Sequence, residues 1–76
     1  MRVVKNAAYP FPSNALIAEI DADGTGWSIC DTTGAMWNHF EGDDADYRAE
    51  KTVAQLAHVH KMHAYWISPL SFVSER

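Results

Sequence analysis

The fold is decided by the stretch DDADYRAEKTVAQLAHVHKMHA, residues 43–64, whose apolar side chains repeat with the period of a helix. Steps of three or four residues link Ala49, Val53, Leu56, His60 and Ala64, and Ala57 lies four residues after Val53. This spacing is typical of a helix that buries one stripe against a sheet. The pattern therefore predicts a single amphipathic helix in the C-terminal half of the chain.

Two signals compete for the start of this helix. The acids at its front favour a start near Asp44, because carboxylates are stabilised at the positive end of the helix dipole. The run Thr52-Val53-Ala54-Gln55 matches a capping box and would place the start later. We expect one helix over 44–62 that ends before Ser68-Pro69, since the residue before a proline resists helical geometry.

Upstream of the helix, short apolar runs alternate with turns. Residues 16–20 and 27–31 are predicted strands that form a hairpin around the Asp- and Gly-rich turn 21–26. A third strand is predicted over 35–40, after the turn 32–34. The alternate prolines in residues 7–14 favour an extended loop. Residues 66–67 and 70–73 are predicted to form a last short strand.

These elements predict an α+β fold: a small antiparallel sheet of three to four strands in meander order, packed against one helix. At 76 residues, with no repeat and no linker, the chain is expected to form one domain over residues 1–76. A domain of this size buries only about 60% of the surface of its unfolded chain, so we expect modest stability.

The charges are distributed unevenly along the chain. Eight of the ten acids lie between Asn6 and Tyr47, and this stretch contains no lysine or arginine. Such a region repels polyanions and attracts basic surfaces over roughly 10 Å at ordinary ionic strength. The acidic balance therefore disfavours direct binding of nucleic acid and favours a partner with a basic surface.

Cys30 is the single cysteine, which excludes an intrachain disulfide and favours a reducing compartment. The N-terminus has two basic residues but no apolar segment behind them, and no apolar run is long enough to span a membrane. We expect a cytoplasmic protein. Cys30 lies in a predicted strand and is expected to be a small buried hydrophobe, so we do not expect an enzyme.

The turn that begins with Asp21-Ala22-Asp23-Gly24-Thr25-Gly26 resembles the start of a calcium loop. The carboxylate required at position twelve would be Thr32, and no helix is predicted before the loop. Asp and Gly are also the residues that a hairpin turn needs. We therefore expect a turn and no calcium site.

Three histidines, His58, His60 and His63, lie within six residues. Imidazole is a ligand for zinc, copper and nickel, but on a helix only His60 and His63 would share a face. We expect histidines at a helix C-terminus, where they interact with the last carbonyls and the dipole, and no resident metal or other cofactor. A metal-binding protein that uses this cluster remains an alternative.

Aromatic side chains flank a group of carboxylates around the predicted start of the helix. We expect this set to form a partner-binding site, with charge providing steering and aromatic rings providing affinity; its residues are Trp37, Glu41, Asp43, Asp44, Asp46 and Tyr47. The predicted function is that of a small acidic binding protein that docks a carboxylate-rich face on a basic surface of a larger protein, a class that includes nucleic-acid-binding surfaces. Inhibitors such as nucleic-acid mimics and phage-encoded antagonists of host machinery are binding proteins of this kind. The alternative is a small homodimeric structural or regulatory module.

Overall fold

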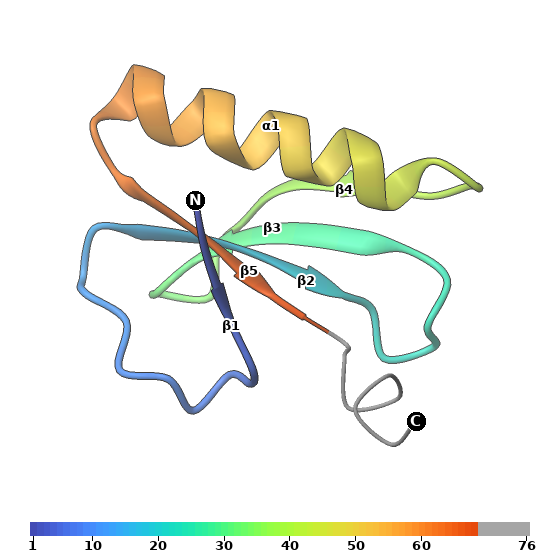
Figure 1. Cartoon of the computed structure of the whole chain (residues 1–76), viewed down its shortest axis with the longest axis horizontal. Helices are drawn as coiled ribbons and strands as arrows, with labels where there is room; N and C mark the ends of the chain where they lie inside the picture. Colours follow the sequence, from blue (N-terminus) through green and yellow to red (C-terminus); the bar gives the residue numbers. More distant parts are fainter. Residues whose placement is uncertain (69–76) are drawn as a thin grey trace.

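One helix packs on one face of a five-stranded sheet (Figure 1). The computed structural model describes residues 1–68 of the chain. Its elements, in chain order, are β1 (Arg2–Val4), β2 (Ala15–Ile20), β3 (Trp27–Asp31), β4 (Met36–Phe40), α1 (Ala45–His60) and β5 (His63–Ile67). The strands follow one another across the sheet in the order β1-β5-β2-β3-β4. The predicted α+β class is confirmed.

The sheet is mixed and has five strands, so the prediction of an antiparallel meander with three to four strands is correct only for β2, β3 and β4. β2, β3 and β4 pair antiparallel in chain order. β5 instead pairs parallel with both β2 and β1. The reason is that α1 carries the chain back across the sheet before β5 begins, and a strand that follows such a crossover runs parallel to its neighbour. The predicted strand segment 70–73 lies outside the described residues.

The helix begins at Ala45, close to the predicted start, and the capping-box alternative at Thr52 is wrong. It ends at His60, before the predicted end at residue 62, because Lys61 adopts a left-handed conformation with φ of 58°. The amide of Met62 then donates to the carbonyl of Ala57 over 2.8 Å, which closes the helix end. This early stop leaves residues 63–67 free to form β5.

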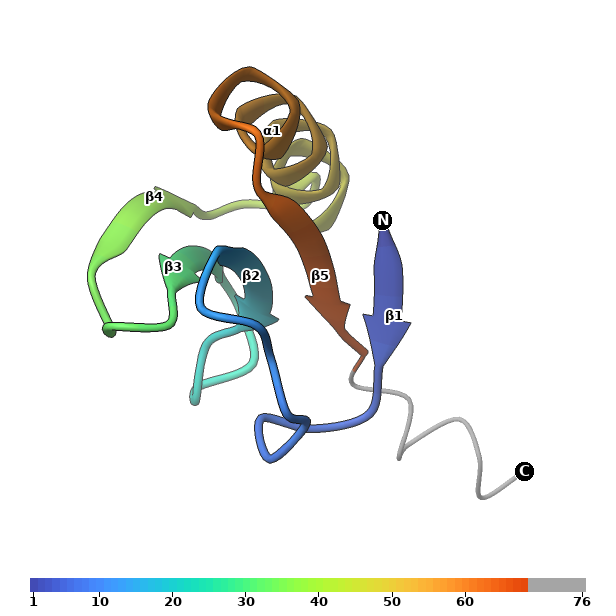
Figure 2. The same ribbon diagram turned by 90° about the vertical axis from the view of Figure 1, so that its left-hand side faces the viewer.

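Alternate residues of the sheet face opposite sides. The helix lies on one side and the β1–β2 loop on the other (Figure 2), and both sides carry apolar clusters. On the helix side, Leu16, Ala18 and Ile29 pack against Val53 and Ala57 of α1. Next to them the rings of Trp27 and Trp66 stack with centroids 4.0 Å apart. On the other side the loop that joins β1 to β2 folds across the sheet, and its aromatic residues cover a second cluster, whose members are Val4, Tyr9, Phe11, Ala15, Ile17, Tyr65 and Ile67.

A bulge in β4 changes which of its side chains face which side of the sheet. Cys30 pairs with Met36 and Ile29 pairs with Asn38, so Trp37 is an extra residue with no partner on β3. Beyond the bulge Ser28 pairs with His39. The bulge therefore places His39 on the side of the sheet that faces away from the helix, beside the β2–β3 turn.

Candidate functional site

Two connections bring most of the acids of the molecule to one end of the sheet. β2 and β4 both end there and α1 begins there, on the right of Figure 1. The β2–β3 turn contributes two carboxylates, and the β4–α1 connection with the first turn of the helix contributes four. We call this group the acidic end; its residues are Asp21, Asp23, Glu41, Asp43, Asp44 and Asp46.

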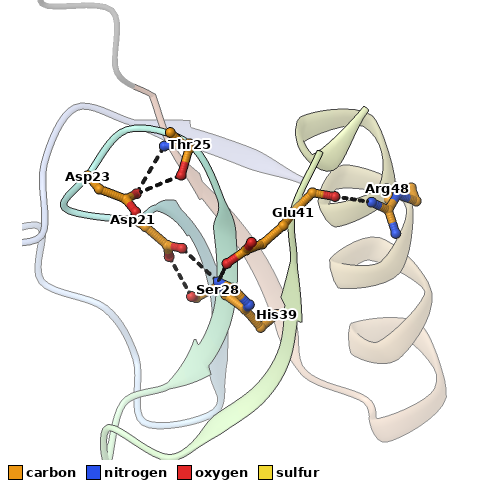
Figure 3. Close-up of polar contacts among 7 residues, drawn as sticks. All are labelled: Asp21, Asp23, Thr25, Ser28, His39, Glu41 and Arg48. Carbon is orange, nitrogen blue, oxygen red and sulfur yellow. Dashed lines mark hydrogen bonds and ion pairs between the residues drawn. The ribbon is translucent and has the colours of Figure 1, made fainter. Parts of the chain in front are cut away.

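The acidic end contains an ion pair between Asp21 and His39 (Figure 3). Asp21 Oδ2 lies 2.7 Å from His39 Nε2, and the Ser28 hydroxyl donates to Asp21 Oδ1 over 2.8 Å. Glu41 Oε2 lies 3.7 Å from the same imidazole nitrogen. One histidine side chain therefore holds two carboxylates from different connections together.

These contacts shift both pKa values in the direction that favours the ion pair. The hydrogen bond from His39, followed by that from Ser28, lowers the pKa of the Asp21 carboxyl. The hydrogen bond to Asp21 raises the pKa of His39. The stabilisation that Asp21 contributes is complete at pH values above the ordinary pKa of an aspartate, and it is lost as the pH falls through the lowered pKa. The stabilisation that His39 contributes is complete at pH values below the ordinary pKa of a histidine, and it is lost as the pH rises through the raised pKa. The pair therefore stabilises the fold most at weakly acidic pH.

The arrangement of Ser28, Asp21 and His39 does not activate the serine hydroxyl as a nucleophile. Asp21 lies between Ser28 and His39, and the serine hydroxyl donates to the carboxylate rather than to the imidazole. In an activated serine the imidazole itself accepts the hydroxyl proton. The arrangement is therefore an Asp21–His39 ion pair that the Ser28 hydroxyl supports through a hydrogen bond, with the Glu41 carboxylate nearby.

Gly26 makes room for this pair. A Cβ at position 26 would lie 2.5 Å from Asp21 Oδ2 and 3.1 Å from His39 Nε2, and also 2.9 Å from the carbonyl oxygen of Phe40. Real Cβ atoms do not approach other atoms so closely, and the carbonyl belongs to the backbone and cannot turn away. A glycine is therefore required for the turn to close on β4.

The β4–α1 connection is organised by Arg48 on the second turn of the helix. Its guanidinium donates to the main-chain carbonyl of Glu41 (Figure 3). Its Nε donates to Asp44 Oδ1 over 3.0 Å. The same guanidinium lies 5.4 Å from the centre of the Phe40 ring. Arg48 thus neutralises one of the six carboxylates and fixes the backbone of the connection, while the rest of the acidic end stays negative.

Five of the six predicted partner-binding residues lie together here: Glu41, Asp43, Asp44, Asp46 and Tyr47. All five are exposed. Tyr47 shows 60% of its surface to solvent, and the amine of Lys51 lies 5.7 Å from the centre of its ring. The connection thus combines exposed carboxylates with one exposed aromatic ring.

The sixth predicted residue, Trp37, lies elsewhere. Its ring contacts His60 edge to face with centroids 5.0 Å apart, and its indole N–H donates to Asp31 Oδ2 over 3.0 Å. His60 ends the 16-residue helix whose first turn carries Asp46, which separates the two ends by about 20 Å. Trp37 is half-buried and joins the bulge to the far end of α1.

Sequence reasoning missed the contributions of Asp21 and His39 to this end. It assigned Asp21 to a turn and His39 to a strand, both correctly, but did not bring them together. If the pairing of β3 with β4 continued from Cys30 and Met36 without a bulge, Ser28 would pair with Asn38. His39 would then lie on the helix side of the sheet, away from Asp21. The bulge at Trp37 has no clear signal in the sequence.

The β2–β3 connection is a hairpin turn, as predicted. The Asp21 amide donates to the Gly26 carbonyl over 2.7 Å, the Gly24 amide donates to the Asp21 carbonyl over 2.9 Å, and Gly24 has φ of 79°. The carboxylate of Asp23 accepts hydrogen bonds from the backbone amide and the hydroxyl of Thr25, each over 3.0 Å. The two carboxylates of the calcium-like motif therefore engage separate partners instead of converging.

The three clustered histidines and Cys30 take different positions. His58 and His60 are exposed on the last turn of α1, and His63 is exposed at the start of β5. Among residues 1–68, the one group of three metal-ligating side chains with ligand atoms within 4.8 Å of one another is Asp21, His39 and Glu41. Cys30 is half-buried on the side of the sheet away from the helix, and burial raises the pKa of its thiol.

The sequence matches no protein-family model, and no curated protein or solved structure shows significant similarity to it. Within residues 1–68, α1 is too short and too polar to cross a membrane. The interpretation of the acidic end therefore rests on its own geometry and charge.

Proposed function

We propose that this chain is a small acidic binding protein that docks its acidic end on a basic surface of a larger protein. The observation that carries the proposal is the convergence of six carboxylates from two connections, with Arg48 as their main basic neighbour. Like charges that lie close together oppose folding. A surface that keeps them is suited to a partner that supplies the missing positive charge.

The exposed aromatic ring strengthens this proposal. Tyr47 lies on the first turn of α1, directly after Asp46, and projects into solvent. Carboxylates at the rim of an interface accelerate association, whereas a desolvated tyrosine contributes affinity. The proposed contact surface therefore comprises the acidic end together with the adjacent Tyr47. A nucleic-acid-binding surface is the class of basic partner that best fits such a patch, and the proposed role is inhibition by occupying that surface.

The test is a pull-down from cell lysate at low and high salt, with captured proteins identified by mass spectrometry. The test variant is Asp43→Asn with Asp46→Asn, which leaves the Asp44–Arg48 ion pair intact. The matched control is Gln55→Lys with Val59→Lys, two exposed positions farther along the helix. Both variants change the net charge by the same amount, but only the first does so at the acidic end.

We expect one discrete partner to bind the wild type and the control variant and to be lost with the Asn variant. Binding should weaken as salt increases, because interactions between exposed charges are screened. Equal capture by all three proteins would contradict the proposal, and so would a partner whose binding does not depend on salt.

A homodimeric module is the second candidate. A shallow groove of about 760 Å³ crosses the side of the sheet away from the helix, and its apolar lining includes Ile17, Cys30 and Met36. Met36 lies on the edge strand β4 and is 60% exposed. Sedimentation of the purified chain separates the candidates, because self-association through this side would give a dimer without any added partner.

A further inference from the structure

The acidic end contains a group of side chains with mixed ligand chemistry. Asp21 follows β2, His39 lies in β4 and Glu41 follows β4, yet one ligand atom of each lies within 4.8 Å of the others (Figure 3). The group joins one imidazole nitrogen to two carboxylate oxygens. Zinc sites use such combinations, with three protein ligands and an open fourth position.

We propose that Asp21, His39 and Glu41 bind a divalent ion of the zinc class, with solvent at the fourth position. This inference goes beyond the proposed function, because it concerns a small cation and needs no protein partner.

The separations between the ligand atoms are close to those that zinc requires. Bonds of about 2.0–2.2 Å in a tetrahedron place ligand atoms about 3.3–3.6 Å apart. The imidazole nitrogen of His39 lies 2.7 Å from Asp21 Oδ2 and 3.7 Å from Glu41 Oε2. Both separations differ from the tetrahedral value by less than 1 Å, and the carboxylate oxygens of Asp21 and Glu41 lie within 4.8 Å of each other. The Glu41 side chain is 71% exposed and free to make most of the movement.

The surroundings hold the first two ligands in place. The Ser28 hydroxyl binds Asp21 Oδ1 and leaves Oδ2 directed at His39. Groups that orient a ligand in this way are a regular feature of metal sites, and their loss lowers metal affinity. The missing side chain of Gly26 leaves space beside the two ligand atoms, which a Cβ would fill.

The ligand set also selects the class of ion. Calcium and magnesium prefer sites built from oxygen alone, and magnesium retains several waters. A site with imidazole favours the later first-row metals, of which zinc, copper and nickel bind most strongly. We therefore expect zinc to bind here and calcium and magnesium not to bind.

The experiment is a calorimetric titration of zinc into the full chain without a histidine tag, at neutral pH. We compare the wild type with His39→Gln, Glu41→Gln and the control His63→Gln, which removes an exposed histidine from β5. The wild type and the control should bind one zinc per chain. His39→Gln should weaken binding at least about tenfold, since even the loss of a supporting group costs this much.

Circular dichroism establishes that each variant is folded. If His39→Gln does not fold, Glu41→Gln carries the test, because its exposed side chain can be replaced without disturbing the core. No zinc binding up to millimolar concentration would overturn the proposal. Unchanged binding by His39→Gln and Glu41→Gln would do the same, and a loss in His63→Gln would locate the zinc at the histidine cluster instead.

Discussion

Val53→Ala is the substitution that most directly tests how α1 packs on the sheet. Val53 is fully buried and contacts the cluster that contains Leu16 and Ile29. The same helix carries a second valine, Val59, that is 64% exposed. Val53→Ala and Val59→Ala are therefore the same chemical change on the same helix, once in the core and once in solvent.

The expected effects follow from burial. Val53→Ala removes two buried methyl groups, which costs about 1.6 kcal/mol in transfer free energy. The cavity of about 40 Å³ that it leaves adds about 1 kcal/mol. Alanine favours a helix over valine by about 0.5 kcal/mol. Val53→Ala should therefore destabilise the protein by about 2 kcal/mol, whereas Val59→Ala should stabilise it by a few tenths of a kcal/mol.

Thermal unfolding followed by circular dichroism measures the difference. In a domain of this size 1 kcal/mol shifts the melting temperature by about 4–8 °C, so Val53→Ala should melt about 8–16 °C below the wild type. Val59→Ala should melt at or slightly above the wild type. Equal melting temperatures for the two variants would refute the assigned helix face, and so would a larger loss in Val59→Ala.

Three further predictions concern the turns. Gly26→Ala should destabilise the fold by about 1–3 kcal/mol in urea titration, because its Cβ would clash with the Phe40 carbonyl; wild-type stability would contradict the turn geometry. Hydrogen bonds from Thr33 and Trp37 lower the pKa of Asp31 to about 2. The Asp31 carboxylate therefore stabilises the fold fully above pH 3.8, and this stabilisation is lost as the pH falls towards 2. Asp31→Asn should therefore lose less stability than the wild type between pH 5 and pH 2; an equal loss would show that Asp31 does not contribute. Millimolar calcium should leave the melting temperature unchanged, and a rise that a chelator reverses would show that the β2–β3 turn binds the ion.

The helix and the central hairpin could be predicted from the sequence because their signals are local. The stripe formed by Ala49, Val53 and Ala57 is the buried face of α1. The predicted strand 27–31 coincides with β3, and the predicted strands 16–20 and 35–40 each differ from β2 and β4 by one residue. Period and turn composition determine these elements without reference to the rest of the chain.

The mixed character of the sheet could not be predicted in this way. β1 has three residues, and it pairs with β5 across more than 60 positions of the sequence. β5 starts directly after the helix, because Lys61 makes the left-handed turn that a glycine usually makes. Without a glycine to indicate the end of the helix, Ala64 of β5 also fits the apolar pattern of the helix.

The candidate site likewise contains one part that could be predicted from the sequence and one part that could not. The acids around Asp44 are adjacent in sequence, so their proximity in space could be predicted. Asp21 reaches them only because β2 and β4 end at the same side, and His39 only because the bulge at Trp37 shifts it by one position. Trp37 was grouped with the acids from its closeness in sequence, but β4 runs along the helix and carries it to the opposite end.

The two proposals share two carboxylates, those of Asp21 and Glu41, which links them thermodynamically. A zinc ion held by Asp21, His39 and Glu41 would add two positive charges to the acidic end. A basic partner would supply positive charge to the same place. Each ligand should therefore weaken the binding of the other by the same factor. Asp43 and Asp46 take no part in the proposed zinc site, so their replacement distinguishes a contact with the partner from the loss of a metal ligand.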